Sequence, residues 1–446
     1  MKHYKIKKGY DIPVKGMAEK TLENTAMPVL QAVTPSEFQG IKPRLDVKQG
    51  DTVEIGTILF HDKQMPQVRF ASPASGKVHE IVYGPRRKLE RIVISVQDSK
   101  AKSYSSYKTS DISSIKKDEL VTALLDAGVW PYIRQRPFNK IADPGKSPSS
   151  VFVNCMDTAP LAADQAFALQ EESENFRAGI EALKVLSGGK VNIVTNKNDT
   201  AFQNISGVNY YSFAGKHPAG LVSTHIDKID PISGHKIIWH LNARDVAMVG
   251  SFLLNGKFPV TRVVALTGDG LKKTRYVKTV AGVQLQHIVT DLKTDDQRVI
   301  SGNLLTGSNQ GKDGFLGFYD GQITVIPEGR EQYFLGWMAP GFTRPSFSRA
   351  FMSALLPGKK YGMDTNQNGE ERAFVKTGDY AKVMALDILP EFLAKSVLAG
   401  DIEEMENLGI LECDPEDFAL CSYICPSKID FMKIIKDGQD MMAKEM

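Results

Sequence analysis

Residues 130–164 read WPYIRQRPFNKIADPGKSPSSVFVNCMDTAPLAAD, and the fold class follows from this stretch. An aromatic and basic segment leads into a β-rich run at 150–153, which ends in a polar turn at 154–160. Ligands of open α/β sheets bind just beyond the carboxyl ends of strands, so we expect a site at this turn. The segment has no G-x-G-x-x-G to bring the backbone close to a phosphate group. The stretch therefore predicts a cofactor-binding type of fold without the usual phosphate loop.

The composition limits the class of protein. A chain of 446 residues is too long for one ordinary domain and predicts about three. Its 55 basic and 52 acidic residues leave a net charge of +3, which is too balanced to indicate a nucleic-acid partner. We find no apolar run long enough to span a bilayer and no signal peptide. The four cysteines then indicate free thiols in a reducing cytoplasm.

Residues 1–102 are dense in short β-like runs, and we predict one β-domain there. The order G-D-x-V, G-x-x-L and A-S-P-x-S-G-x-V resembles the barrel-sandwich fold of biotinyl and lipoyl carrier domains. Its glycines fall where hairpins turn with positive φ. Carriers are modified on a lysine between the two halves, where this sequence has Lys63. We expect a β-domain reused as a scaffold, with modification of Lys63 as the alternative.

Residues 103–257 alternate between β-like and helical patterns, which predicts a Rossmann-like α/β domain with a parallel sheet. A Ser-, Lys- and Tyr-rich linker comes first, at 103–115. The periodicity then predicts helices at 116–127, 160–187 and 243–254 and a strand at 190–194.

Residues 258–330 show strand, strand, helix and strand patterns, which fit a small β-grasp domain of the SLBB type. Residues 331–446 begin as a loop-rich aromatic segment and end in helices near 385–398, 402–408 and 429–443. The aromatic side chains near Arg344 and Arg349 fit a docking patch or core packing equally well.

Two short motifs suggest ligand loops but fail on spacing. GSNQGKD at 307–313 is one residue short for a phosphate loop and has Asp where Ser or Thr should bind magnesium. DTNQNG at 364–369 matches the first half of a calcium loop, yet its twelfth position is Val375 instead of glutamate. We interpret both segments as polar turns.

Histidines and cysteines suggest metal sites, and we predict none. His225, His235 and His240 span a proline and a glycine, so we interpret them as separate structural histidines. The run Cys413-x7-Cys421-x3-Cys425-Pro426 resembles the end of a bacterial ferredoxin motif without its tight C-x2-C spacings. Three thiolates cannot supply four ligands, which indicates a relic of an iron–sulfur site.

Long segments resemble the A subunit of the Na+-translocating NADH:quinone reductases (the Nqr complexes), a family related to the Rnf complex C subunit and to the flavin-binding subunit of respiratory NADH dehydrogenase. The resemblance is carried by KIKKGYDIPVKG at 5–16, VLQAVTPSEFQGIKPRLDVKQGDTV at 29–53, RQRPFNKIADP at 134–144, FVNCMDTAPLAAD at 152–164 and ALCSYICPSK at 419–428. The flavin-binding relatives carry G-x-G-G-A-G-F-P-T before the strand and N-A-D-E-x-E-P after it. Here those places read WPYIRQRPF and NCMDTAP. Bulky side chains thus replace the glycines that let FMN approach, which argues against bound flavin and against NADH oxidation by this chain.

The resemblance implies an α/β multidomain protein that is a peripheral subunit on the cytoplasmic face of a bacterial inner membrane. It implies a sodium pump of six subunits, in which such a chain packs against the membrane-embedded B subunit at the quinone-reducing end. NADH, FMN, FAD and iron–sulfur centres would belong to other subunits. This chain would have no catalytic residues and no tightly bound cofactor, with ubiquinone or menaquinone as a ligand.

A quinone needs an apolar slot with hydrogen-bond donors at its carbonyl groups. We place such a pocket at the residues of the opening stretch that combine aromatic and polar side chains, namely Trp130, Arg134, Arg136, Phe138 and Asp157. Three alternatives remain: a stand-alone flavoprotein dehydrogenase, an Rnf-type electron carrier with flavin or iron–sulfur, and a lipoyl-like carrier acting through Lys63. The missing glycines oppose the first, and the missing cysteines oppose the second.

Overall fold

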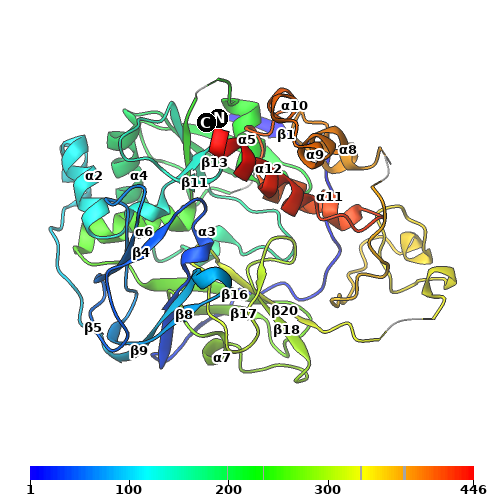
Figure 1. The fold of residues 1–446 in the computed structure, drawn as a ribbon, viewed down its shortest axis with the longest axis horizontal. Helices are drawn as coiled ribbons and strands as arrows, with labels where there is room; N and C mark the ends of the chain where they lie inside the picture. Colours follow the sequence, from blue (N-terminus) through cyan, green and yellow to red (C-terminus); the bar gives the residue numbers. More distant parts are fainter. Residues whose placement is uncertain (198, 235, 332–333, 375–377, 446) are drawn as a thin grey trace.

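The computed structural model describes residues 1–445 except 198, 235, 332–333 and 375–377. Within these residues the strands form sheets of seven, six, four and three strands. In Figure 1 the six-stranded sheet lies below the seven-stranded one, and the C-terminal helices lie at the upper right. No helix in the described part of the chain is long and apolar enough to cross a membrane.

The seven-stranded sheet is built around β12, the apolar run singled out in the sequence. Both neighbours of β12 run parallel to it, and both faces of the strand are buried. This is the pattern expected of a strand that helices cover on two sides. In spatial order the strands are β1 (Lys2–Lys5), β14 (Asn209–Ala214), β13 (Val191–Asn196), β12 (Ser150–Asn154), β15 (Ile238–Asn242), β10 (Arg134–Arg136) and β11 (Lys140–Ile141).

Helices cover both faces of this sheet, as the alternation of side chains along β12 requires. Val151 and Val153 point to one face and belong to a core with α4 and α6, while Phe152 points to the other and packs with α5. Helices α4 and α6 approach closely, since a Cβ at Gly250 would lie 1.8 Å from the carbonyl oxygen of Asn175. The helices of this part are α1 (Thr109–Ile112), α2 (Lys117–Asp126), the 3-10 turn η3 (Trp130–Tyr132), α3 (Gln165–Ala168), α4 (Ser173–Ser187), α5 (Val222–Ile229) and α6 (Ala243–Asn255).

The barrel-sandwich is formed by the two smaller sheets. Lys63 is exposed just after β6, on the turn that leads to β7, as expected for the hairpin of a carrier domain. The four-stranded sheet has β3 (Leu30–Val33), β9 (Leu89–Asp98), β8 (Ser75–Tyr83) and β5 (Thr52–Val53), and the three-stranded sheet has β4 (Pro43–Leu45), β6 (Ile58–Asp62) and β7 (Arg69–Ala71), with 3-10 turns η1 (Pro35–Glu37) and η2 (Pro85–Arg87).

The six-stranded sheet and α7 form the β-grasp part. It joins the barrel-sandwich through a buried and a partly buried polar contact: the Gln31 amide donates to the carbonyl oxygen of Ala281 at 2.8 Å, and the Phe318 N–H donates to Glu37 at 2.6 Å. In spatial order the strands are β19 (Ser308–Asn309), β18 (Gln297–Ser301), β20 (Gln322–Pro327), β16 (Thr261–Thr267), β17 (Arg275–Val280) and β2 (Leu22–Asn24), and α7 is Leu285–Ile288.

The C-terminal helices enclose a core of their own, which includes Cys413, Cys421 and Cys425. Phe138 from the loop after β10 belongs to the same core, so this helical part is fastened to the seven-stranded sheet. The elements after β20 are the 3-10 turns η4 (Gly336–Met338), η5 (Met352–Leu355) and η6 (Pro415–Phe418) and the helices α8 (Tyr380–Val383), α9 (Pro390–Ala399), α10 (Ile402–Asn407), α11 (Ala419–Ile424) and α12 (Phe431–Glu445).

The structure departs from the sequence-based expectation in two places. Residues 1–102 do not all belong to the barrel-sandwich, because β1 pairs with β14 and β2 pairs with β17. The helix expected at 160–187 is two helices, α3 and α4. Asp164 caps α3 through the Phe167 N–H, and Phe167 packs on Tyr276 of the β-grasp part with ring centroids 4.7 Å apart. These contacts between distant segments override the local helical pattern.

Candidate functional site

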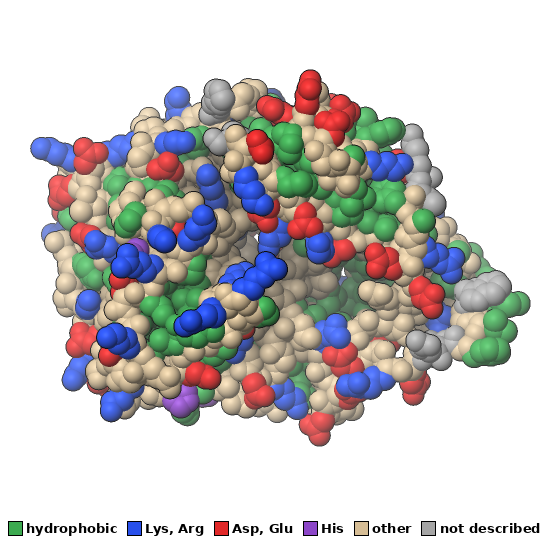
Figure 2. Space-filling model, in the orientation of Figure 1, with side chains coloured by type: hydrophobic (Ala, Val, Ile, Leu, Met, Phe, Trp, Pro, Cys, Tyr) green, Lys and Arg blue, Asp and Glu red, His purple; other side chains and the backbone are tan. Residues whose placement is uncertain are grey.

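A cavity of about 210 Å³ lies where the seven-stranded sheet, the β-grasp part and the C-terminal segment meet. From β12 the chain continues on one side of the strand through β13 and β14, and it then crosses to the other side of β12 to form β15. The order of the strands therefore reverses between β12 and β15. Asn154 and Asn242 end these two strands, are partners in the ladder and both line the cavity. Ligand crevices of open α/β sheets lie at such a point. Figure 2 shows the face hollowed near its middle, with charged side chains around the hollow.

Two guanidinium groups and a tyrosine form one wall. The Arg134 guanidinium lies 4.6 Å from the ring centroid of Tyr319, which is a cation–π contact. Arg244, at the start of α6, donates to the backbone carbonyl oxygen of Tyr319 and forms an ion pair with Asp245 at 3.5 Å. A Cβ at Gly321 would lie 2.4 Å from a guanidinium nitrogen of Arg244, so a larger residue there would displace the guanidinium from its present position. These contacts fix two positive groups at the cavity.

Three carboxyl groups also line the cavity, and each has a raised pKa. Burial raises the pKa of Asp320, which accepts a hydrogen bond from Ser301 at 2.6 Å. Burial and the neighbouring Asp414 carboxylate raise the pKa of Glu416. Asp157 also lines the cavity, where loss of hydration raises the pKa of its carboxyl group. These groups hold a proton at higher pH than an ordinary carboxyl does.

Two histidines of the wall are neutral at physiological pH. Burial lowers the pKa of His217 to about 4, and its Nδ1 lies 3.2 Å from the hydroxyl of Thr158. Burial and the two nearby arginines, Arg134 and Arg136, lower the pKa of His240, whose Nε2 lies 3.0 Å from the side-chain oxygen of Asn139. Neutral imidazoles can donate or accept one hydrogen bond without adding charge.

The five residues predicted to form a pocket separate into two groups. Arg134 and Asp157 line the cavity. Trp130 is fully buried, donates to the carbonyl oxygen of Ala142 at 2.7 Å and packs edge-on against Trp239. Phe138 lies in the core of the C-terminal helices. These two side chains are held by core packing and do not line the cavity.

Arg136 is also absent from the wall, because the C-terminal segment covers it. Its guanidinium is fully buried and forms ion pairs with Asp414 at 2.8 Å and with Glu416 at 3.1 Å. Arg134 and Arg136 are two residues apart on β10 and share a face. The turn η6 covers the second arginine and leaves the first at the cavity. Arg136 thus positions Glu416, a residue of the wall.

Sequence reasoning missed most of the wall. It singles out Asn154, His240 and the polar turn after β12, but not Asn242, Arg244, Asp320 or Glu416. One signal was available, because SVFVN and IWHLN both end a buried β run on asparagine. Polar residues at the ends of parallel strands gather at one sheet edge.

Two of the other candidate ligands contact groups within the protein. His225 Nε2 lies 2.9 Å from the carbonyl oxygen of Ala219, and the Tyr380 hydroxyl lies 3.0 Å from the Cys425 sulfur. Among the described residues no group of three His, Cys, Asp or Glu side chains is placed to hold a metal ion. His235 and Val375 lie outside the described residues.

Comparison with protein families matches three segments in chain order. Residues 4–97 match the NqrA N-terminal barrel-sandwich hybrid domain, residues 115–258 the NqrA second alpha/beta domain, and residues 263–311 the NQRA C-terminal domain of SLBB type. These matches confirm the expected barrel-sandwich, α/β and β-grasp parts.

Curated relatives match along the whole chain. The chain is 37% identical over 444 residues to the A subunit of the Na(+)-translocating NADH-quinone reductase of Marinomonas sp. (strain MWYL1), covering 99% of this chain and 100% of the relative. It is 37% identical to the protein of that name from Vibrio anguillarum and 39% identical to that from Klebsiella pneumoniae (strain 342), covering 99% of both chains in each case. The chain therefore belongs to the NqrA family, the A subunits of Na(+)-translocating NADH-quinone reductases.

Proposed function

We propose that this protein serves as the A subunit of a sodium-translocating NADH-quinone reductase and binds the headgroup of ubiquinone or menaquinone in the cavity at the switch point. The observation that carries the proposal is the position of the cavity at the carboxyl ends of β12 and β15, with Arg134 in its wall. In this proposal other subunits oxidise NADH and hold the FMN, FAD and iron–sulfur centres.

The shape and chemistry of the cavity support a headgroup as the ligand. A headgroup is a flat ring with two carbonyl oxygens, and the amide of Asn242 and the guanidinium of Arg134 supply donors. The Asn154 amide already donates to the carbonyl oxygen of Gly220 at 2.9 Å. Leu221, Val222 and Leu305 supply apolar surface beside them. A volume of about 210 Å³ holds a ring but no long isoprenoid tail, so the tail would remain outside.

Quinone reduction also needs two protons at the ring oxygens. Asp157 and Glu416 stand in the wall with raised pKa values, so they can hold a proton where a reduced quinone oxygen needs one. The electrons would come from a redox centre of a neighbouring subunit. We assign no electron-carrying group to this chain.

We also propose that this chain does not bind FMN, and the residues that replace the flavin loop support this. Trp130, Pro131 and Tyr132 are buried in η3, and Arg136 is fixed on β10 by two acidic side chains. Strand β10 is paired with β15 on one side and with β11 on the other, and bulky side chains pack this segment, so it offers no row of free backbone N–H groups to a phosphate.

The partners follow from the same proposal. We infer that the chain contacts the other subunits of the complex, chiefly the membrane-embedded B subunit. It would lie at the cytoplasmic face of the inner membrane as a peripheral subunit.

The test is a calorimetric titration of the full chain with ubiquinone-1, a short-tailed and water-compatible quinone. Arg134→Met and Asn242→Leu should each weaken binding about tenfold or more, because each removes a donor to a ligand carbonyl in a buried site. Arg69→Met is the matched control, since Arg69 is an exposed arginine of the barrel-sandwich paired with Asp126.

Two results would contradict the proposal. If both cavity variants bind ubiquinone-1 as the unaltered chain does, the cavity is not the quinone site. If an absorption spectrum and acid extraction of the purified chain reveal stoichiometric flavin or iron, the chain carries electrons itself. The first result concerns the site, whereas the second concerns the cofactor assignment.

A further inference from the structure

Residues 334–360, called here the basic-apolar loop, expose more large apolar side chains than any other segment that the structure describes. Phe334 is 92% exposed, Leu355 is 69% exposed and Met338 is 65% exposed. The full set of exposed large apolar residues in the loop is Phe334, Leu335, Met338, Phe342, Met352, Leu355 and Leu356. Figure 2 shows hydrophobic side chains gathered at the right-hand end of the molecule, where Figure 1 places this loop.

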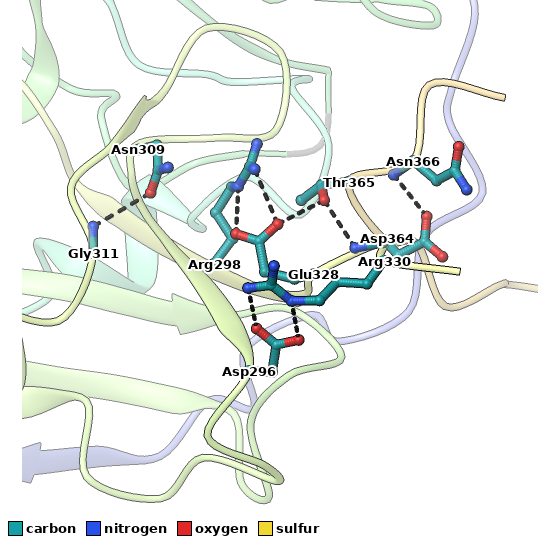
Figure 3. A network of polar contacts seen from close by, with 10 residues as sticks. Asp296, Arg298, Asn309, Gly311, Glu328, Arg330, Asp364, Thr365 and Asn366 are labelled. Carbon is teal, nitrogen blue, oxygen red and sulfur yellow. Dashed lines mark hydrogen bonds and ion pairs between the residues drawn. The ribbon is translucent and has the colours of Figure 1, made fainter. Parts of the chain in front are cut away.

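The two ends of the loop are fastened to one place on the β-grasp part, so the loop projects from a fixed base. Glu328 accepts two hydrogen bonds from Arg298, both at 2.9 Å, and one from the Thr365 hydroxyl at 2.8 Å (Figure 3). Glu328 precedes the loop and Thr365 follows it. Tyr361 adds a second anchor, because its N–H donates to the carbonyl oxygen of Pro13 at 2.8 Å.

The charge of the loop has one sign. Between Glu331 and Asp364 the sequence contains four basic residues and no acidic one: Arg344, Arg349, Lys359 and Lys360. Arg344 is used within the loop, where its guanidinium donates to the carbonyl oxygen of Gly336 at 2.8 Å. Arg349, Lys359 and Lys360 are exposed. The loop therefore presents positive charge beside apolar side chains.

We propose that the basic-apolar loop binds directly to an anionic lipid surface. Apolar side chains on a projecting element enter the boundary between headgroups and acyl chains, and neighbouring basic residues attract anionic headgroups. Aromatic, Met and Arg side chains are also common in protein interfaces, but two of the three exposed basic residues of the loop are Lys, which protein interfaces disfavour, so we commit to a lipid surface. This contact does not depend on the quinone cavity, since the loop lies outside the cavity wall.

The experiment is co-sedimentation of the full chain with lipid vesicles. One set consists of phosphatidylcholine alone, and the other also contains phosphatidylglycerol. We expect binding to the vesicles with phosphatidylglycerol, little binding to the neutral ones, and weaker binding as salt is raised, because salt screens charges at the surface.

Two pairs of variants separate the loop from the rest of the surface. Lys359→Glu/Lys360→Glu should weaken binding at least about tenfold, since each basic residue near an anionic surface contributes roughly a fivefold factor. Its matched control is Lys7→Glu/Lys8→Glu, an adjacent pair of exposed lysines elsewhere that gives the same change of charge. Leu355→Ser should also weaken binding. Its control is Leu398→Ser, which should not weaken binding although Leu398 is 63% exposed on α9.

Three results would overturn the proposal. The first is no binding to vesicles of either composition. The second is equal loss of binding in the loop variants and in their controls. The third comes from a parallel sedimentation with native membranes, if binding there disappears once the membrane proteins are digested, because the loop would then dock on a protein. All the substituted side chains are exposed, so unchanged thermal unfolding of each variant will show that the fold is kept.

Discussion

Replacing Arg136 with methionine tests whether a buried ionic cluster holds the C-terminal helices to the sheet. Arg136 comes from β10, and its partners Asp414 and Glu416 come from the segment around η6. The arginine is 1% exposed, so its charge is compensated by those carboxyls instead of by water. Methionine fills a similar space without charge and leaves the carboxyls of Asp414 and Glu416 without their positive partner.

The expected loss of stability is large. Removing one member of a buried ion pair destabilises a protein by about 3–5 kcal/mol, because the other charge stays buried without compensation. An exposed pair of the same kind contributes under about 1 kcal/mol. Arg69 and Asp126 form such a pair at 2.9 Å, with side chains 43% and 53% exposed. Arg69→Met is therefore the matched control for Arg136→Met.

The loss of stability in Arg136→Met should also depend on pH. Burial and the neighbouring Glu416 raise the pKa of Asp417 to about 8, whereas an ordinary aspartate titrates near 3.8. Between these values the unfolded chain releases a proton that the folded chain keeps, so stability falls as pH rises from about 4 to about 8. Without Arg136, which favours the ionised carboxyls, this fall should extend above pH 8.

Hydrogen exchange measures the result locally, because it reports the free energy of opening for individual segments. We expect faster exchange in η6 and α11 of Arg136→Met, with the barrel-sandwich unchanged. If Arg136→Met and Arg69→Met lose stability equally, by under about 1 kcal/mol, then the ionic cluster does not hold the C-terminal helices.

Two further predictions concern packing and thiols. Gly250→Ala should lower the midpoint of thermal unfolding, because the new Cβ would lie 1.8 Å from the carbonyl oxygen of Asn175 and overpacking costs about 1–3 kcal/mol or more. Ser251→Ala on the same helix should change the midpoint little. Equal effects of the two substitutions would contradict the close packing of α4 and α6. Burial raises the pKa of the Cys155, Cys413 and Cys421 thiols, and Cys425 is buried too. Iodoacetamide should therefore label none of the four in the native protein at pH 8 and all four in denaturant, as mass spectrometry can show. Labelling of Cys413, Cys421 or Cys425 in the native protein would mean that the C-terminal core opens.

The family and the order of the domains could be predicted from the sequence, and so could many elements. A short apolar run such as residues 150–153 predicts a buried strand, because its successive side chains point to opposite faces and both faces must then be covered. Helices expected at 116–127 and 243–254 are α2 and α6 of the structure. Periodicity and breakers are local properties, so local sequence is enough to specify them.

The membership of the candidate site could be predicted only in part. Arg134 precedes the β-rich run at 150–153 and Asp157 follows it, and both residues line the cavity. Trp130 and Phe138 entered the predicted pocket for their aromatic rings, which the structure places in cores. An aromatic ring in a sequence has the same pattern whether it packs in a core or faces a ligand, so the pattern could not separate the two uses.

The sequence by itself determined which segments are buried strands and helices, since hydrophobic spacing and turn residues act over a few positions. Only the tertiary structure decided which of two equivalent arginines faces the cavity. Arg134 and Arg136 share one face of β10, but η6 arrives from nearly three hundred residues away and covers only the second. That contact is made when the chain folds back, and no property of the segment around β10 encodes it.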